Sequence, residues 1–154
     1  MRNMTKALQE LQEKIGYQFH EEVLLKQALT HSSFANEQKI NKLKNYERLE
    51  FLGDAVLELI SSEFLYNENV DMPEGQLTRL RASMVCEPAL AYCARDIRLN
   101  SYILLGKGEE ATGGRTRDSI ISDVMEAVIG AIFLDGGIEN AKKFIYRFIL
   151  SELE

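Results

Sequence analysis

The chain has 154 residues, of which 45% are hydrophobic, and it contains 2 prolines and 10 glycines. This length and composition predict one globular domain with its own core, and they exclude a disordered chain or a fibrous repeat. With 18 basic and 24 acidic residues the net charge is −6, the wrong sign for holding nucleic acid through overall charge. A role with nucleic acid would need metal ions at an acidic site and local basic segments.

The longest uninterrupted apolar run, AVIGAIFL at 127–134, is far shorter than the roughly 20 residues that span a bilayer, so no membrane association is expected. The N-terminal residues contain no apolar stretch of the signal-peptide type, which predicts a cytoplasmic protein. Cys86 and Cys93 lack the short spacing and His neighbours of a zinc site, so we expect two buried, reduced thiols within a helical stretch.

Apolar residues recur at helical spacing along nearly the whole chain, so the predicted fold class is all-α. The first predicted helix covers about 5–15. The second covers about 21–29 and precedes a turn at His31, whose imidazole we expect to bond the backbone rather than act in catalysis. After a polar loop, a long third helix is predicted from Asn45, as its N-cap, to about Tyr66.

Pro73 opens a predicted helix over 76–85, and the Glu87–Pro88 pair opens another that reaches about 97. A glycine-rich loop is predicted at 106–114. A strongly apolar helix then covers about 119–134 and ends at the DGG sequence 135–137, and an amphipathic helix covers about 139–153. We find no internal repeat or linker, so residues 1–154 are expected to form a single domain.

The third predicted helix carries an acidic stripe. At about 100° per residue, four acids share one narrow face, while apolar residues occupy the others. The four acids are Glu47, Glu50, Asp54 and Glu58. Like charges at this spacing repel one another, and more strongly where burial lowers the dielectric. A cation is therefore expected beside the stripe.

A second acidic pair, Asp123 and Glu126, lies on the strongly apolar helix, which should be buried. Ala127 and Gly130 share the face of this pair, and their small size would let another helix approach closely. We therefore predict that the pair meets the acidic stripe. The alternative is that both sets of acids are solvated faces of surface helices, but the apolar surroundings favour buried carboxylates that need a cation.

A cluster of carboxylates without His or Cys selects hard cations, chiefly Mg²⁺, with Mn²⁺ as a substitute. A di-iron helical bundle is the rival interpretation. That class uses Glu-x-x-His on its helices, and here His20 and His31 lie outside both acidic segments.

Two long motifs resemble a known family. NYERLEFLGDAVLEL at 45–59 resembles the signature segment of ribonuclease III, and DVMEAVIGAIFLDGG at 123–137 is similar to the second acidic segment of that family. LLKQALTHSSF and GKGEEATGGRTRDS match intervening elements in the same order. The resemblance covers nearly the whole chain.

The resemblance implies an all-α endonuclease domain that forms a symmetric homodimer and cuts both strands of double-stranded RNA. The products would carry 5′-phosphates and 3′-hydroxyls, and the substrates would be rRNA and other structured RNAs. The implied metal-binding carboxylates are Glu50, Asp54, Asp123 and Glu126, with Asp54 and Glu126 most essential to catalysis. Glu47 and Glu74 match further acidic positions near the catalytic valley of the family.

Phe51 matches an aromatic position that inserts into the partner subunit in this family, although periodicity alone allows it to complete its own core. For RNA contact we favour Arg115 and Arg117, because glycines and a helix start beside them expose N–H groups that attract anions. Bacterial members also carry a double-stranded-RNA-binding domain after the catalytic one. This chain stops at Glu154, so that domain is expected to be absent from it.

Two functions from other classes stay open at this stage. One is a catalytically silent, dimeric RNA-binding module on the same fold, which could lose carboxylates without penalty. The other is a helical interaction domain with no role in RNA chemistry. The presence of all four carboxylates and of both long motifs favours the enzyme.

Overall fold

The computed structural model describes residues 3–41 and 44–153, and among these residues it contains helices and no β-strand. The all-α fold class is thus confirmed. The helices are α1 (Met4–Ile15), α2 (Glu22–Ala28), α3 (Ser32–Glu37), α4 (Glu47–Glu68), α5 (Glu74–Val85), α6 (Glu87–Asp96), α7 (Lys107–Ala111) and α8 (Asp118–Phe148). Short 3₁₀ turns are η2 (Leu99–Tyr102), η3 (Gly114–Thr116) and η4 (Leu150–Leu153).

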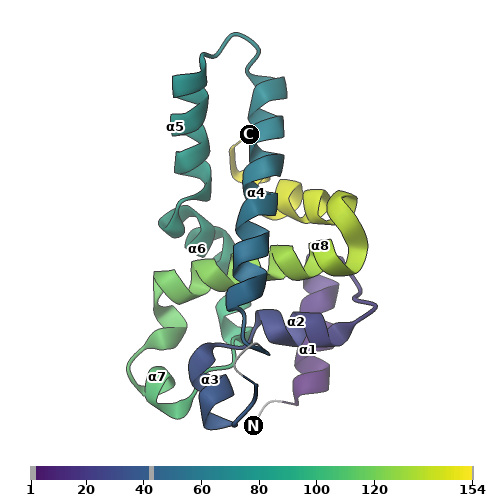
Figure 1. The fold of residues 1–154 in the computed structure, drawn as a ribbon, viewed down its shortest axis with the longest axis vertical. Helices are drawn as coiled ribbons and strands as arrows, with labels where there is room; N and C mark the ends of the chain where they lie inside the picture. The colour runs from purple at the N-terminus through teal and green to yellow at the C-terminus, as the bar shows by residue number, and fades with distance from the viewer. Residues whose placement is uncertain (1–2, 42–43, 154) are drawn as a thin grey trace.

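The two longest helices, α4 and α8, cross near the middle of the molecule (Figure 1). Their backbones touch at the crossing. A Cβ atom built on Gly53 of α4 would lie 1.7 Å from the carbonyl oxygen of Glu126, and one built on Gly130 of α8 would lie 2.3 Å from that of Leu49. The close approach predicted from the small Gly130 is confirmed, and only glycine at both positions permits it.

The first half of α8 forms the centre of the core. Residues 124, 125 and 127–132 are all buried, and α2, α4 and α6 pack around them. By contrast, α5 buries only Met84 and lies beside the C-terminal half of α4, with which it forms a projecting two-helix arm (Figure 1). Arg81 ties the two helices of this arm together, because its guanidinium binds Glu58 at 2.9 Å and the hydroxyl of Ser62 at 2.8 Å.

The prediction of a loop at 106–114 is wrong in detail, since α7 lies within this stretch and η3 begins at its end. Side chains from α3 account for this local order. The hydroxyl of Ser33 accepts a hydrogen bond from the Gly106 N–H (2.9 Å), and the carboxylate of Glu37 accepts one from the Lys107 N–H (2.7 Å). These contacts between distant segments supply the capping that the local sequence lacks.

The turn predicted at His31 begins α3, and the His31 Nδ1 atom accepts a hydrogen bond from the Ser33 N–H at 3.0 Å, which confirms its bond to the backbone. The two helices predicted at the C-terminal end are confirmed, because the segment labelled α8 consists of two helices that meet at a kink, where the backbone of Gly137 is non-helical (φ 84°, ψ 176°; Figure 1). The expectation of two buried thiols is half wrong, because Cys93 is buried but Cys86 is exposed between α5 and α6.

None of the helices among the described residues has both the length and the apolar character that crossing a membrane requires.

Candidate metal centre

Three carboxylates converge where α4 crosses α8. Glu50, Asp123 and Glu126 each offer one oxygen, and these three oxygens lie within 4.8 Å of one another. All three side chains are partly buried. The Gly53 crossing is the cause, because it places the first turns of α4 directly over the Asp123–Glu126 segment of α8.

The start of α4 is fixed by hydrogen bonds on both sides. The Asn45 side chain accepts a bond from the Glu47 N–H at 2.9 Å, and the Tyr46 carbonyl accepts one from the Glu50 N–H at 2.8 Å. Asn45 thus binds the first helical N–H, although the residue at the N-cap itself is Tyr46. This capping sets the direction in which the acidic stripe leaves the first turn.

The cluster holds its acids in an environment that disfavours negative charge. Burial, followed by the hydrogen bond and charge of Asp54, raises the pKa of Glu126 to about 9. Burial and the neighbouring Asp123 raise the pKa of Glu50 to about 7. Burial also raises the pKa of Asp123. A bound divalent cation would offset both the burial and the mutual repulsion of these groups.

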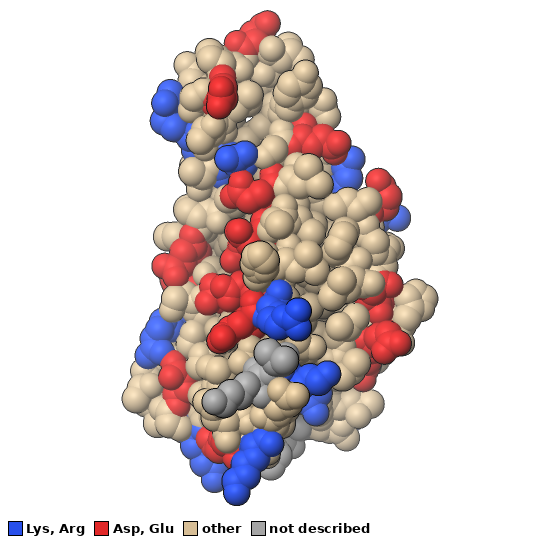
Figure 2. All heavy atoms as spheres, viewed as in Figure 1, with Lys and Arg blue, Asp and Glu red and all other residues tan. Residues whose placement is uncertain are grey.

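The other predicted acids lie at different distances from these three. Asp54 is exposed but hydrogen-bonds Glu126, so it borders the cluster. Glu47 is exposed in the first turn of α4, and its charge acts on both Glu50 and Asp123. Together with the acids further along α4, they contribute to a band of negative charge on one face of the molecule (Figure 2).

Glu74 is not brought to the cluster within this chain. It begins α5 and borders a cavity of about 280 Å³ between the two helices of the arm, beside Ser62 and Arg81. Ser62 is twelve residues beyond Glu50 on α4, which corresponds to about 18 Å of helix. Glu74 could therefore act together with such a cluster only if the cluster belonged to another subunit.

Phe51 does not complete the core of its own subunit, since its side chain is 75% exposed. Beside it lies a groove of about 610 Å³, which is lined by Leu24, Gln27, Glu47, Arg48, Leu49, Phe51, Leu52 and Leu134. The aromatic side chain and the largely apolar groove form an uncovered patch next to the acidic band. Exposed apolar patches of this kind mark contacts with other molecules.

The two arginines predicted to contact RNA are engaged within the chain to different degrees. Arg115 binds the Glu110 carboxylate at 2.9 Å and 3.0 Å and donates to the carbonyls of Asn100 (3.0 Å) and Ile103 (2.8 Å). Arg117 pairs with Glu109 and donates to the Thr112 carbonyl at 3.1 Å. These carbonyl partners could not be predicted from the residue pattern, because they lie in another segment or depend on local folding.

Tyr46 was not singled out by the sequence, yet it lies beside the cluster. It is 5% exposed, and its ring lies 5.7 Å from that of His31. Burial, followed by the charges of Asp123 and Glu50, raises its pKa well above the usual range. Helical periodicity could not reveal it, because its closeness to His31 and to the acids of the cluster depends on the tertiary fold.

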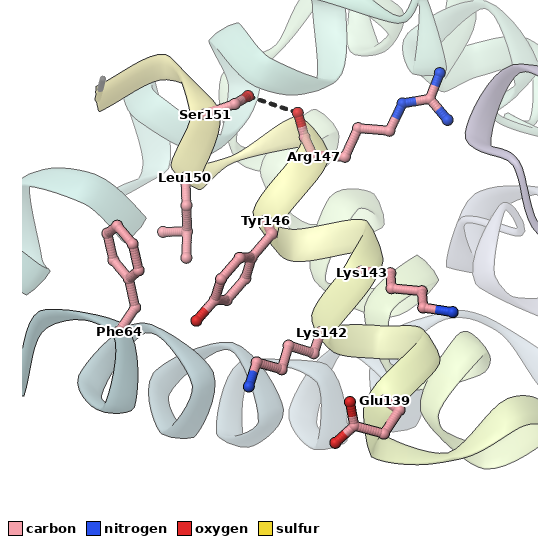
Figure 3. Close-up of a pocket in the computed structure, with 8 residues that line it drawn as sticks. All are labelled: Phe64, Glu139, Lys142, Lys143, Tyr146, Arg147, Leu150 and Ser151. Atoms are coloured by element: carbon pink, nitrogen blue, oxygen red, sulfur yellow. Dashed lines mark hydrogen bonds between the residues drawn. The ribbon is translucent and has the colours of Figure 1, made fainter. Parts of the chain in front are cut away.

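A groove of about 510 Å³ lies between α4 and the last turns of α8, and Figure 3 shows Phe64, Tyr146 and Leu150 around it. Lys142 at its edge binds Glu63 at 3.3 Å. None of the clustered carboxylates is among the described residues that line it, so it takes no part in the metal centre.

Comparisons with known proteins agree on one family. Residues 21–153 match the family model described as Ribonuclease-III-like. The chain is 54% identical over 146 residues to the ribonuclease 3 of Caldanaerobacter subterraneus, covering 93% of this chain and 64% of that protein. It is 52% identical over 145 residues to the ribonuclease 3 of Enterococcus faecalis, covering 94% and 63%. The chain thus spans slightly less than two thirds of the length of these curated relatives.

Among solved structures, a nuclease domain of ribonuclease III from Campylobacter jejuni superposes with a TM-score of 0.87 at 42% identity, over 94% of this chain and 96% of that one. That structure was described for flexibility in a region involved in dimer formation. Both helices that carry the clustered carboxylates, α4 and α8, lie inside the matched residues.

Proposed function

Because the chain belongs to the ribonuclease III family, we propose that it is an endoribonuclease that cleaves double-stranded RNA by metal-assisted phosphodiester hydrolysis. The products carry 5′-phosphate and 3′-hydroxyl ends, and the substrates are rRNA and other structured RNAs of the cytoplasm. The observation that carries the proposal is the convergence of Glu50, Asp123 and Glu126 at the crossing of the two matched helices.

The residues at the cluster fit a hard divalent cation. Their donors are carboxylate oxygens close enough together to share one ion, and such donors select Mg²⁺, with Mn²⁺ as a substitute. The raised pKa values of Glu50 and Glu126 indicate that the folded chain holds these acids at an energetic cost that a cation offsets. When bound, the ion activates the attacking water and neutralises charge that develops on the phosphate.

The chain's own groups divide the remaining work. We assign Glu50, Asp123 and Glu126 to holding the cation, with Asp54 completing the set. Asp54 lies one turn after Glu50 on α4 and is open to solvent, so its carboxylate can orient a water on the substrate side. Its contact with Glu126 places the two carboxyl groups side by side. Asp54 and Glu126 are therefore the residues on which the chemical step depends most.

A symmetric homodimer is part of the proposal. Phe51 projects from the face of α4 that also carries Ala55 and Leu59, and both of these are exposed. In an isologous contact the Phe51 of each subunit can enter the apolar groove of the other, which has a volume of about 610 Å³. The acidic bands of the two subunits then lie close enough to act on opposite strands of one duplex.

The proposal is tested by incubating the purified chain with a long duplex RNA, in Mg²⁺ and in EDTA, and determining the product ends. We expect cleavage in Mg²⁺ alone. Asp54→Asn and Glu126→Gln should each lower the rate by about 100-fold or more, because each removes a group that acts on the reacting atoms. Glu68→Gln is the matched control, since it removes an exposed carboxylate at the far end of the same helix.

Two results would contradict the proposal at different levels. Cleavage at the parental rate by either cluster variant in saturating Mg²⁺ would show that the residue assignment is wrong. Binding of duplex RNA without cleavage by the parental chain would favour a silent RNA-binding module instead of a nuclease.

A further inference from the structure

The segment before α8 carries two acid–arginine pairs of similar appearance. Glu109 and Glu110 are neighbours in the short helix α7, and they pair with Arg117 and Arg115 respectively. Each arginine also donates to main-chain carbonyl oxygens. The two pairs nevertheless differ in how firmly each guanidinium is held.

Arg115 is fixed. Its Nε atom donates to both Glu110 oxygens, and one terminal nitrogen donates to the carbonyls of Asn100 and Ile103. Its side chain is 31% exposed. Moving the guanidinium away would remove a hydrogen bond from each of these two partly buried carbonyls, which costs free energy. We therefore assign Arg115 to holding η2 against α7, and not to contact with RNA.

Arg117 is held less firmly. Apart from Glu109, it donates to one carbonyl, that of Thr112, and its side chain is 44% exposed. The Glu109 side chain is 24% exposed, so the pair lies at the surface with its acid partly buried. Ion pairs near the surface contribute little free energy, so the guanidinium can exchange this carboxylate for another anion. The planar guanidinium accepts a phosphate in the same paired geometry as a carboxylate.

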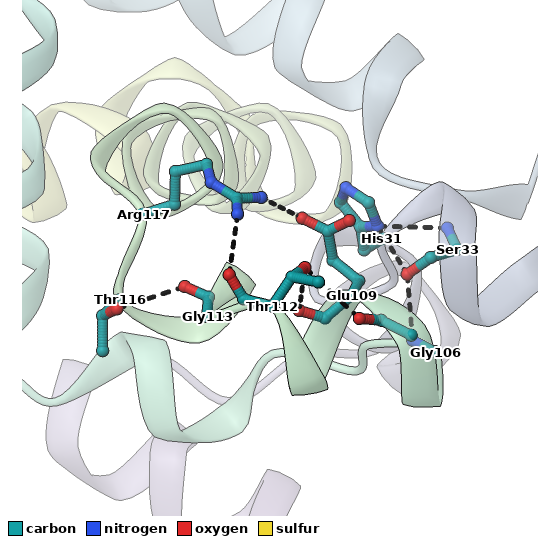
Figure 4. Close-up of polar contacts among 9 residues, drawn as sticks. His31, Ser33, Gly106, Glu109, Thr112, Gly113, Thr116 and Arg117 are labelled. Atoms are coloured by element: carbon teal, nitrogen blue, oxygen red, sulfur yellow. Dashed lines mark hydrogen bonds and ion pairs between the residues drawn. The ribbon is translucent and has the colours of Figure 1, made fainter.

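The Arg117–Glu109 pair lies beside the metal centre. Figure 4 shows the Glu109 carboxylate between the Arg117 guanidinium and the His31 imidazole. The His31 ring packs against that of Tyr46, which borders the carboxylate cluster. Arg117 also directly precedes α8, six residues before Asp123, or about 9 Å along the helix. A duplex seated on the cluster would therefore pass close to Arg117.

Two hydrogen bonds hold the helix that carries Glu109. The bonds from Gly106 to Ser33 and from Lys107 to Glu37 fix the beginning of α7 on α3. The backbone that carries Glu109 is thus anchored at two points, whereas the Arg117 guanidinium is at the end of a longer side chain.

We propose that the Arg117 guanidinium binds a backbone phosphate of duplex RNA next to the metal centre, and that this phosphate displaces the Glu109 carboxylate from it. Glu109 is then a positioning residue, which holds Arg117 extended toward the substrate path and competes with the phosphate. The inference rests on the proposed action on duplex RNA. It gives two neighbouring acids of equal charge different roles, because Glu109 competes with RNA for Arg117, whereas Glu110 holds Arg115 within the fold.

The test measures the affinity of the chain for a short duplex RNA over a range of salt concentrations, with Ca²⁺ in place of Mg²⁺. Arg117→Ala should weaken binding about tenfold and reduce the slope of log K against log salt by about 1, because one phosphate contact is lost. Glu109→Gln should tighten binding about three- to fivefold, since no ion pair has to be broken.

Glu110→Gln is the matched control, because it removes the same charge one residue away while Gln keeps an acceptor for Arg115. It should leave affinity unchanged. The double variant Arg117→Ala/Glu109→Gln should bind no more tightly than Arg117→Ala alone. Thermal melts should show that each variant is folded.

Equal tightening by Glu109→Gln and Glu110→Gln would overturn the inference, since it would mean that bulk charge alone is responsible. A gain from Glu109→Gln that persists without Arg117 would overturn it as well. Either result leaves the proposed function intact if the parental chain cleaves duplex RNA in Mg²⁺. Failure of the parental chain to bind or cleave duplex RNA would instead contradict the proposed function itself.

Discussion

The backbone of Gly53 lies directly against the carbonyl oxygen of Glu126, so that a Cβ atom at position 53 would come within 1.7 Å of it. This contact joins the first turns of α4 to the segment of α8 that carries Asp123 and Glu126. The distance between the two acidic segments is thus set by a residue that has no side chain. The metal centre depends on the helix crossing as much as on its carboxylates.

Gly53→Ala should separate the two helices and destabilise the fold by about 3 kcal/mol or more, because the new methyl group would overlap backbone that cannot rotate away. Chemical denaturation measures the loss. Gly108→Ala is the control, since a Cβ there would meet nothing within 4 Å and alanine favours the helix. Equal stability of the Gly53 variant and the parent would show that the crossing is looser than the structure indicates.

The acidic stripe and the small Gly130 could be predicted because helical periodicity is a local property of the sequence, and it places residues on faces before any tertiary contact is known. The helix and turn within residues 106–117 could not be predicted in this way. They depend on Ser33 and Glu37, about 70 residues away, and on the carbonyls of Asn100 and Ile103. Likewise, periodicity showed that Phe51 lies beside the stripe, but its exposure depends on which elements cover α4.

Binding of Mg²⁺ or Mn²⁺ should raise the thermal midpoint, and EDTA should reverse the shift, because the ion binds the folded cluster. At about 100 times its dissociation constant an ion stabilises by about 2.7 kcal/mol, or several degrees for a domain of this size. Protons on Glu50 and Glu126 compete with the ion, so the shift should be larger at about pH 8 than at about pH 6.

Calorimetric scans of Glu126→Gln and Glu68→Gln distinguish the cluster from general charge effects. The first variant should lose most of the metal-dependent shift, and the second should keep it. A full shift in Glu126→Gln would mean that the ion binds elsewhere.

Phe51→Ala should weaken self-association by about 100-fold or more. The contact is isologous, so one substitution removes two aromatic anchors from each dimer. Sedimentation velocity over a range of concentrations measures the change. Tyr92→Ala provides the comparison, because Tyr92 is 63% exposed on α6, outside the proposed interface. A parental chain that stays monomeric at every concentration would rule out the dimer.

Asp135 joins the end of the apolar half of α8 to the start of α2. Its carboxylate accepts hydrogen bonds from the Tyr17 hydroxyl (2.5 Å), the His20 N–H (2.9 Å) and the Glu21 N–H (2.8 Å). Glu21, the N-cap of α2, makes no side-chain cap of its own. Burial alone would raise the pKa of Asp135, but these hydrogen bonds outweigh burial and hold the pKa below its usual range.

A carboxyl group whose pKa is lower in the folded than in the unfolded chain stabilises the fold above its unfolded pKa, and this contribution is lost as the pH falls through the folded value. Asp135→Asn should therefore destabilise the protein by about 2 kcal/mol at neutral pH, because hydrogen bonds to a charged acceptor are replaced by weaker ones. The difference from the parent should shrink below about pH 4. Urea denaturation at several pH values gives both quantities, with Asp71→Asn as the control for an exposed carboxylate. If the destabilisation were the same at every pH, Asp135 would act through its shape and not through its charge.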